Sequence, residues 1–186
     1  MSKTDLSAYN NNWYPPTIGA PSWKRLLWYG TSLVFFESAW LPFNSLKIGL
    51  LRAFGARVGK GVVIKPRVQI KYPWLLSIGD HSWIGEGVWI DNLCQVQVGA
   101  HACLSQGAYL LTGNHNYKKA SFDLMVAPIT LEDGVWIGAK AVVCPGITCY
   151  SHSVLSVGSI ATTNLEAYLI YQGNPALPIK KRTIDQ

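Results

Sequence analysis

An aliphatic side chain recurs every six residues along most of the chain, and four positions after each one a second, mostly small or β-branched, residue follows. The register positions are Val58, Ile64, Ile70, Ile78, Ile84, Ile90, Val98, Leu104, Leu110, Leu131, Ile137, Val143, Cys149 and Leu155. A period of six fits neither an α-helix nor an alternating strand, but it is typical of a parallel β-helix. The pattern therefore predicts an all-β fold, a left-handed parallel β-helix with three hexapeptides in each triangular coil, against the usual right-handed crossover rule.

Three irregularities interrupt the repeat, each after a third hexapeptide. The steps from Ile70 to Ile78 and from Ile90 to Val98 are eight residues long, and the step from Leu110 to Leu131 is twenty-one. All three insertions should therefore leave the prism at the same corner. We expect the β-helix to span residues 58–163, with an inserted active-site loop at 111–130, and residues 164–186 to form a C-terminal tail.

Residues 1–57 lie outside the repeat, and we expect an extended lead-in followed by short helices. Prolines fall within residues 13–22, an apolar aromatic run begins at Trp23, and residues 44–54 form a second helix with Asn44 as N-cap and Gly55 as terminator. The uncharged part of the first run, Leu26 to Phe36, is too short to span a bilayer. These helices either cap the open end of the β-helix or contact a membrane surface through residues 23–41, and the two interpretations are compatible.

Positive charge is concentrated in the N-terminal third. Residues 1–71 contain ten Lys or Arg and two Asp or Glu, which gives +8, while residues 72–186 contain six and eight, which gives −2. This asymmetry favours an anionic surface such as phospholipid head groups, and no nucleic-acid-binding motif accompanies it. The start of the chain lacks a signal-peptide pattern, and the four cysteines form no C-x-x-C pair. We therefore expect a cytoplasmic protein, peripheral at the inner face of the cytoplasmic membrane, that binds no nucleic acid.

Aromatic side chains fall on outward-facing positions of the predicted prism. Trp83 and Trp136 share one face, and Trp89 and Tyr109 share the next. Exposed aromatic area is unfavourable in water by roughly 25 cal/mol per Å². These faces are therefore expected to pack against other copies of the chain, and a three-sided prism favours a closed homotrimer.

Four motifs together resemble those of the hexapeptide-repeat acetyltransferases. They are Thr112–Tyr117 (TGNHNY), Gly134–Ala139 (GVWIGA), Pro145–Thr148 (PGIT) and Gly173–Ala176 (GNPA), beside the hexapeptides themselves. The family includes galactoside, maltose, nodulation-factor and xenobiotic acetyltransferases, and the chain is similar in particular to colanic-acid-biosynthesis-type sugar O-acetyltransferases. The resemblance implies an acetyl-CoA-dependent O-acetyltransferase that acts on a saccharide hydroxyl in exopolysaccharide or lipopolysaccharide biosynthesis.

In that family a loop histidine is the general base, and His115 matches it. Acetyl transfer to a sugar requires a proton to leave a hydroxyl of very high pKa as its oxygen attacks a thioester. A neutral imidazole can accept that proton and pass it to the departing thiolate. Transfer can then be direct, without a covalent enzyme intermediate. The alternative interpretation is that His115 is a surface histidine without a catalytic role.

The resemblance also implies a donor site. Trp136 and Ala139 match positions at the acyl and pantetheine end of acetyl-CoA, and Thr162 and Thr163 match positions further along it. Lys180 matches a basic residue near the adenosine phosphate, and Arg182 could share that role. Leu177 departs from the family pattern, because relatives often carry a basic residue at its position.

The acceptor contacts rest on weaker similarity. Asp91 and Asn92 lie at the corner of the insertions, one coil before His115, close to an acidic position that binds acceptor hydroxyls in relatives. Asn114 and Tyr117 flank His115 and could contact a sugar ring. The basic N-terminal third would suit a lipid-linked saccharide.

Three alternatives remain open from the sequence. The enzyme could transfer an acyl group to another acceptor, such as an antibiotic or an amino sugar, or the β-helix could be a non-catalytic scaffold. A zinc-dependent gamma carbonic anhydrase is the third, but its close pair of histidines (H-x-x-x-x-H) is absent. His81, His101 and His152 instead occupy equivalent turn positions along one corner, where we expect them to face solvent. No metal site is predicted.

Overall fold

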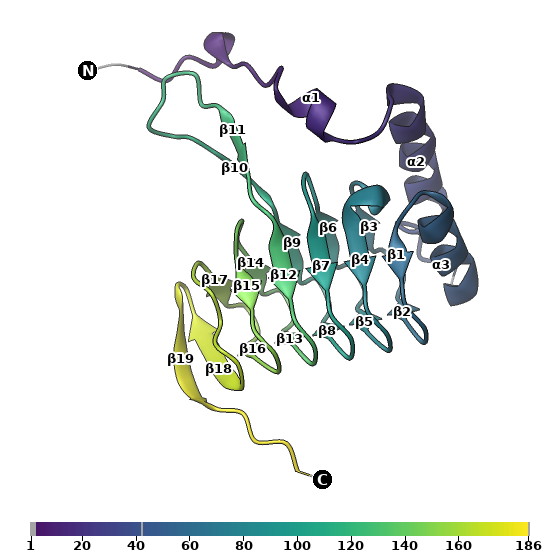
Figure 1. Ribbon diagram of the computed structural model, residues 1–186, viewed down its shortest axis with the longest axis vertical. Helices are drawn as coiled ribbons and strands as arrows, with labels where there is room; N and C mark the ends of the chain where they lie inside the picture. The colour runs from purple at the N-terminus through teal and green to yellow at the C-terminus, as the bar shows by residue number, and fades with distance from the viewer. Residues whose placement is uncertain (1–2, 42, 186) are drawn as a thin grey trace.

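A computed structural model describes residues 3–41 and 43–185 of the chain, and it contains the predicted left-handed parallel β-helix (Figure 1). Three parallel sheets, named A, B and C here, form the sides of the prism. Sheet A consists of β1 (Arg57–Val58), β4 (Leu76–Ile78), β7 (Val96–Val98), β12 (Ile129–Leu131) and β15 (Thr148–Cys149). Sheet B contains β2 (Val63–Ile64), β5 (Trp83–Ile84), β8 (Cys103–Leu104), β13 (Trp136–Ile137), β16 (Val154–Leu155), β18 (Leu169–Gly173) and β19 (Ala176–Lys181). Sheet C contains β3 (Gln69–Ile70), β6 (Trp89–Asp91), β9 (Tyr109–Leu111), β14 (Val142–Val143) and β17 (Ile160–Ala161).

The hexapeptide register defines the core. Every register residue from Ile64 to Leu155 is buried, and residues one coil apart pair directly, as Ile84 does with Leu104. Stacking identical positions at strand spacing places each aliphatic side chain on the one before it. The residues that recur every six positions are therefore the side chains that point into the core.

The corners of the prism hold residues in the left-handed backbone region. His81, His101 and His152 have φ angles of 57°, 55° and 61° and follow one corner, as the register predicts. The rings of His81 and His101 stack with centroids 5.3 Å apart. Their alignment comes from the coil repeat.

All three insertions leave the corner between sheets C and A, as predicted. They connect β3 to β4 through a 3₁₀ turn (Pro73–Leu75), β6 to β7, and β9 to β12. The first two are joined by Asn92, whose side-chain oxygen accepts a hydrogen bond from the Tyr72 N–H while its NH₂ donates to the Tyr72 carbonyl, at 3.0 and 2.6 Å. In the third insertion, the Thr112 hydroxyl donates to the Asp91 carbonyl at 2.7 Å. The corner is thus bonded from coil to coil.

The N-terminal region differs from the sequence expectation in three details. Within the predicted extended lead-in, a one-turn helix α1 (Tyr14–Thr17) forms with two prolines in its first turn, where proline is tolerated, and a 3₁₀ turn precedes it at Leu6–Ala8. The apolar run is helical only over α2 (Ser22–Phe35). Helix α3 (Asn44–Ala53) follows Phe43, so Asn44 is its first residue and not its N-cap. Gly55, with φ of 101°, ends this helix as predicted.

Side chains from α2 and α3 cover the open edge of the first coil. The Asn44 amide donates to the Val62 carbonyl and accepts from the Ile64 N–H. Three further carbonyls of this coil accept hydrogen bonds from the helices: Arg52 donates to Val58, Lys47 to Lys65 and Trp28 to Ile70. All three sheets are therefore capped by these helices, which supports the first of the two interpretations for them.

The tail predicted at 164–186 contains the antiparallel pair β18 and β19, which extends sheet B beyond the last coil. Its end is held by Arg182, which donates hydrogen bonds to the carbonyls of Gly134 and His152 at 2.8 and 3.1 Å. Arg182 thereby fixes the tail to the corner between sheets A and B.

The three outer faces differ in chemistry. Sheet A presents a row of polar residues, Ser77, Gln97 and Thr130, in register. Sheet B presents Trp83 and Trp136, and sheet C presents Trp89 stacked on Tyr109 with ring centroids 4.5 Å apart. Within the described residues, no helix has the length and apolarity needed to cross a membrane.

Candidate active site

His115 lies on a hairpin that projects from the prism. Strands β10 (Gly113–His115) and β11 (Leu124–Val126) pair antiparallel, with His115 opposite Leu124 (Figure 1). The Asn114 side-chain oxygen accepts from the His115 N–H at 2.8 Å. The largest insertion is therefore a hairpin that carries the histidine away from the core.

The imidazole of His115 is held in one orientation. Its Nδ1 lies 2.9 Å from the carbonyl oxygen of Phe122, and its ring stacks on the Phe122 ring with centroids 4.5 Å apart. A carbonyl only accepts hydrogen bonds, so a neutral His115 must carry its proton on Nδ1 and leave Nε2 as an acceptor. Phe122 has φ of 51°, an uncommon region for an aromatic residue, and such backbone is frequent at functional sites.

The N-terminal arm, residues 3–13, lies against this hairpin (Figure 1). The Asp5 N–H donates to the Ala120 carbonyl at 2.8 Å, and the ring of Tyr9 lies 6.0 Å from that of His115. Just beyond the arm, the Tyr14 hydroxyl donates to the Leu93 carbonyl at 2.8 Å. The arm therefore forms part of the surroundings of His115. Sequence reasoning missed this contact because no periodicity links segments a hundred residues apart.

A cleft of about 440 Å³ opens between the arm, the insertion corner and the hairpin. His115, Asn114 and Asp91 line it together, so three of the predicted site residues meet there. Asp91 is paired with Lys71, whose Nζ lies 3.1 Å from Asp91 Oδ1. Lys71, Tyr9 and Tyr72 are cleft residues that the sequence did not single out.

Two other predicted acceptor residues are placed differently. Asn92 is fully buried and both polar groups of its side chain bond to the Tyr72 backbone. Its amide supports the corner and is not open to a ligand. Tyr117 is 76% exposed and lies outside the residues that line the cleft.

The predicted donor residues are distributed over other parts of the prism. Trp136 projects from sheet B, where its Nε1 donates to the Ser105 hydroxyl at 2.9 Å, and Ala139 follows at the next corner. Thr162 and Thr163 are exposed after β17, at the corner of the His115 hairpin but further along sheet C, and Lys180 is exposed on β19. A single chain does not bring Trp136 or Lys180 to His115.

The placement of side chains bears on metal binding and on cysteine nucleophiles. Across residues 3–41 and 43–185, no group of three or more His, Cys, Asp or Glu side chains could hold a metal ion. Burial raises the pKa of all four cysteine thiols, that of Cys149 to about 12. Thiolate nucleophiles are therefore disfavoured at neutral pH.

The chain is similar to known acetyltransferases in sequence and in fold. No family model matches the chain. Over 166 residues it is 36% identical to the Escherichia coli protein named "Putative colanic acid biosynthesis acetyltransferase WcaF", an alignment that covers 88% of this chain and 90% of the relative. It is 27% identical over 135 residues to the galactoside O-acetyltransferase of E. coli, covering 71% and 66%.

Among solved structures, a hexapeptide-repeat-containing acetyltransferase from Vibrio cholerae, solved with acetyl coenzyme A, has the same fold. It superposes with a TM-score of 0.79 at 21% identity, covering 89% of this chain and 92% of that one. The hexapeptide core, the shared fold and the 36% identity to WcaF point to the same family. The chain therefore belongs to the hexapeptide-repeat acetyltransferases and is an acetyltransferase.

Proposed function

We propose that this protein transfers the acetyl group of acetyl-CoA to a hydroxyl of a saccharide, with His115 as the general base. The observation that carries the proposal is the geometry of His115: Nδ1 is held by the Phe122 carbonyl, and the residue lines a cleft with Asp91 and Asn114. The saccharide belongs to exopolysaccharide or lipopolysaccharide biosynthesis, and the name of the 36% identical relative supports this pathway class.

The reaction proceeds by direct transfer. His115 Nε2 accepts the proton of the acceptor hydroxyl while its oxygen attacks the thioester carbonyl. The C–S bond then breaks, the new ester forms, and the imidazolium returns the proton to the CoA thiolate. Because the Phe122 carbonyl stabilises the proton on Nδ1, it also stabilises the imidazolium between the two steps.

Acetyl-CoA is the donor in this proposal. Trp136 and Ala139 contact its acyl and pantetheine end, Thr162 and Thr163 contact it further along, and Lys180 and Arg182 face its adenosine phosphate. Lys180 is exposed and free to pair with phosphate, whereas one nitrogen of Arg182 is already bonded to two carbonyls. Lys180 is therefore the principal phosphate ligand of the two. The complex of the V. cholerae relative with acetyl coenzyme A supports this donor.

The active molecule in this proposal is a homotrimer. Two outer faces carry large aromatic residues, on sheets B and C, while the face of sheet A is polar. If sheet B of one subunit packs beside the later strands of sheet C of the next, around Tyr109, every subunit uses two different faces and the ring closes after three, while the first strand of sheet C with Gln69 stays open toward α2. Such a ring brings Trp136 of one subunit toward the His115 hairpin of another.

The acceptor occupies the cleft beside His115, where Asp91 and Asn114 can form hydrogen bonds with its hydroxyls. Tyr117 is exposed outside the cleft, where it can contact the part of the acceptor that projects from it. Lys71 holds the Asp91 carboxylate in place at 3.1 Å. Asn92 takes no part in binding the acceptor here, because its amide is bonded to Tyr72.

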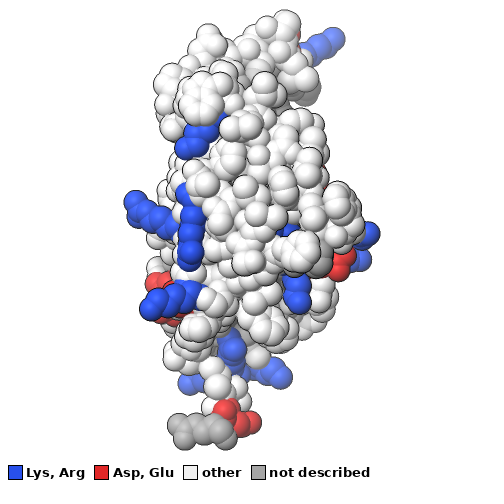
Figure 2. Space-filling view, turned by 90° about the vertical axis from the view of Figure 1, so that its right-hand side faces the viewer, with Lys and Arg blue, Asp and Glu red and all other residues white. Residues whose placement is uncertain are grey.

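A membrane contact through residues 23–41 completes the proposal and places a lipid-linked acceptor within reach. Trp23, Leu26 and Leu27 on α2 are 66%, 72% and 56% exposed, and they border an apolar hollow. Figure 2 faces the end of the molecule that carries α2 and α3, and it shows a largely uncharged surface with Lys and Arg side chains around it. An apolar face with basic neighbours suits the interface of an anionic bilayer. The protein would then act from the cytoplasmic side of the membrane.

The general-base assignment is tested by His115→Ala. Release of free thiol from acetyl-CoA is followed with a panel of saccharides and amino sugars, and the product is identified by NMR. Loss of a general base should lower kcat by about 10²–10⁴-fold.

The matched control is His101→Ala, which removes an exposed turn histidine and should keep full activity. Turnover of His115→Ala within a few-fold of wild type would refute the assignment. If only the amino groups of amino sugars were acetylated, the proposed O-acetyltransferase activity would be wrong and the protein would be an N-acetyltransferase.

A further inference from the structure

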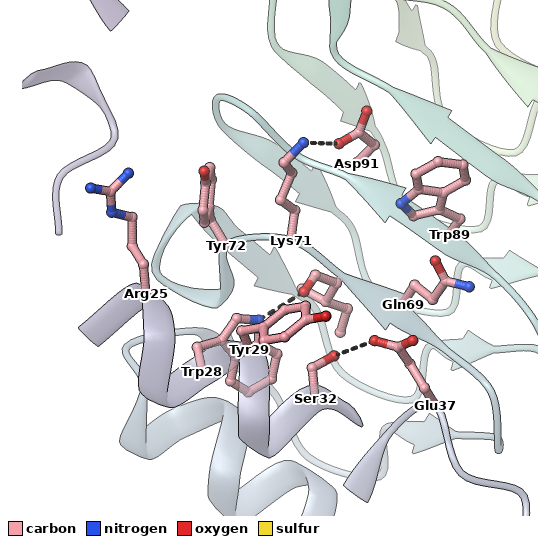
Figure 3. Close-up of a pocket in the computed structure, with 11 residues that line it drawn as sticks. Arg25, Trp28, Tyr29, Ser32, Glu37, Gln69, Lys71, Tyr72, Trp89 and Asp91 are labelled. Carbon is pink, nitrogen blue, oxygen red and sulfur yellow. Dashed lines mark hydrogen bonds and ion pairs between the residues drawn. The ribbon is translucent and has the colours of Figure 1, made fainter. Parts of the chain in front are cut away.

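A second cavity lies directly beside the His115 cleft. It encloses about 380 Å³ between α2 and the start of sheet C, and Figure 3 shows its residues. Trp28 and Tyr29 form its helical side, and Gln69 and Trp89 form its sheet side. Its volume is within the range of small-molecule sites.

The two cavities share a wall. Lys71, Tyr72 and Asp91 line both of them, and the ion pair between Lys71 and Asp91 lies where they meet. In Figure 3 the Lys71 side chain extends toward Asp91 above the cavity. The Lys71 side chain is 42% exposed, so this pair lies at the surface, and a ligand long enough to cross it would reach from the His115 cleft to α2.

The second cavity offers aromatic faces and planar polar groups. Tyr29, Tyr72 and Trp89 provide rings, and the Gln69 amide forms no hydrogen bond within the described chain. The Nε of Arg25 is buried and likewise has no partner among the residues described. Rings that cover apolar C–H faces, together with amide and guanidinium donors for hydroxyls, match the two sides of a sugar.

Charge argues against a nucleotide in this cavity. Its lining contains two cations, Arg25 and Lys71, and two anions, Glu37 and Asp91. Asp91 neutralises Lys71, and Glu37 accepts a hydrogen bond from the Ser32 hydroxyl at 3.1 Å. A diphosphate would meet no net positive charge here, whereas a neutral hydroxylated ligand requires none.

We propose that the acceptor is an oligosaccharide of at least two units. The sugar to be acetylated lies beside His115, and the neighbouring sugar lies in the second cavity between Tyr29 and Gln69. This inference rests on the proposed saccharide O-acetyltransferase activity and adds the class of acceptor to it.

The experiment compares monosaccharides with di- and trisaccharides that contain the same units, and with nucleotide-activated monosaccharides, using the full chain and thiol release. Ring stacking together with one hydrogen bond supplies about 1.4 kcal/mol, which is a tenfold change in affinity, so the best oligosaccharide should exceed its monosaccharide in kcat/KM by about that factor. Tyr29→Ala and Gln69→Ala should each remove most of this advantage without changing kcat/KM for the monosaccharide or KM for acetyl-CoA. Gln97→Ala is the matched control, since Gln97 faces outward from sheet A, away from both cavities.

The outcomes separate the two proposals. Equal use of monosaccharides and oligosaccharides, with no effect of Tyr29→Ala or Gln69→Ala, would overturn the second sugar site and leave the O-acetyltransferase intact. Preference for a nucleotide-activated monosaccharide would also overturn it. Absence of transfer to every saccharide would overturn the proposed function and this inference together.

Discussion

Asn92 was predicted to contact the acceptor, but its side chain stabilises the fold. At the residue scale its amide replaces the backbone pairing that the insertion interrupts, with one hydrogen bond from and one to Tyr72. Asp91, its neighbour, instead lines both the cleft and the second cavity. Adjacent polar residues at the same corner therefore have different roles, and the sequence alone does not distinguish them.

Asn92→Ala should destabilise the protein, because it leaves two backbone groups of Tyr72 without partners. Each unsatisfied buried group costs about 1–3 kcal/mol. Two such groups give a total of about 2–6 kcal/mol, which for a chain of this size lowers Tm by roughly 4–24 °C, a shift that circular dichroism would measure. Asn114→Ala is the control, since Asn114 is exposed and bonds only the adjacent N–H. An unchanged Tm for Asn92→Ala would contradict the role given to its amide.

At the element scale, α2 presents two unlike faces. Its inner side carries Trp28, which is buried and bonded to the edge of the first coil, and its outer side carries large exposed apolar residues. Capping alone requires only the inner side. The outer side is what supports contact with a membrane.

The outer face of α2 should bind anionic vesicles. Wild-type protein is expected to co-sediment with phosphatidylglycerol-containing vesicles more than with pure phosphatidylcholine vesicles. The double substitution Leu26→Ser with Leu27→Ser should weaken binding at least about tenfold, since burying each leucine contributes about 1.5–3 kcal/mol.

Val157→Ser is the control for this experiment, because Val157 is equally exposed but lies on a late coil. A wild-type protein that stayed in the supernatant with both vesicle types would exclude the membrane contact.

The elements could be predicted from the sequence where a repeat constrained them. Each register residue must point inward, so the coils, the sheets and the common corner of the insertions followed from spacing. The reach of the N-terminal arm to His115 did not, because a contact between Asp5 and Ala120 leaves no local pattern. The role of Asn44 as a partner for the edge of β2, in place of the predicted N-cap, was hidden for the same reason.

At the scale of the whole molecule, the proposed site residues lie on different faces of the prism. His115 leaves the prism at the corner between sheets C and A, while Trp136 and Lys180 belong to sheet B. If Trp136 and Lys180 bind the donor as proposed, a complete site requires two copies of the chain in the proposed trimer.

Mixing two inactive variants should restore activity if the site is shared. His115→Ala removes the base, and Ala139→Trp obstructs the donor groove. Each alone should be inactive. In trimers assembled from equal amounts of both, about a quarter of the sites combine an intact base with an intact neighbouring groove, so about a quarter of wild-type turnover is expected. No recovery in mixed trimers, or a monomer in light scattering, would contradict a site between subunits.

The covering of the first coil also decides in which direction copies of the chain can associate. A solenoid with bare strand edges can add further copies end to end and grow into a fibre. Here Arg52, Asn44, Lys47 and Trp28 occupy the edge groups at one end. At the other end, the outermost strand carries Pro178, Lys180 and Lys181, residue types that discourage edge pairing. Growth along the solenoid axis is thus opposed at both ends, which leaves lateral association through the sides of the prism.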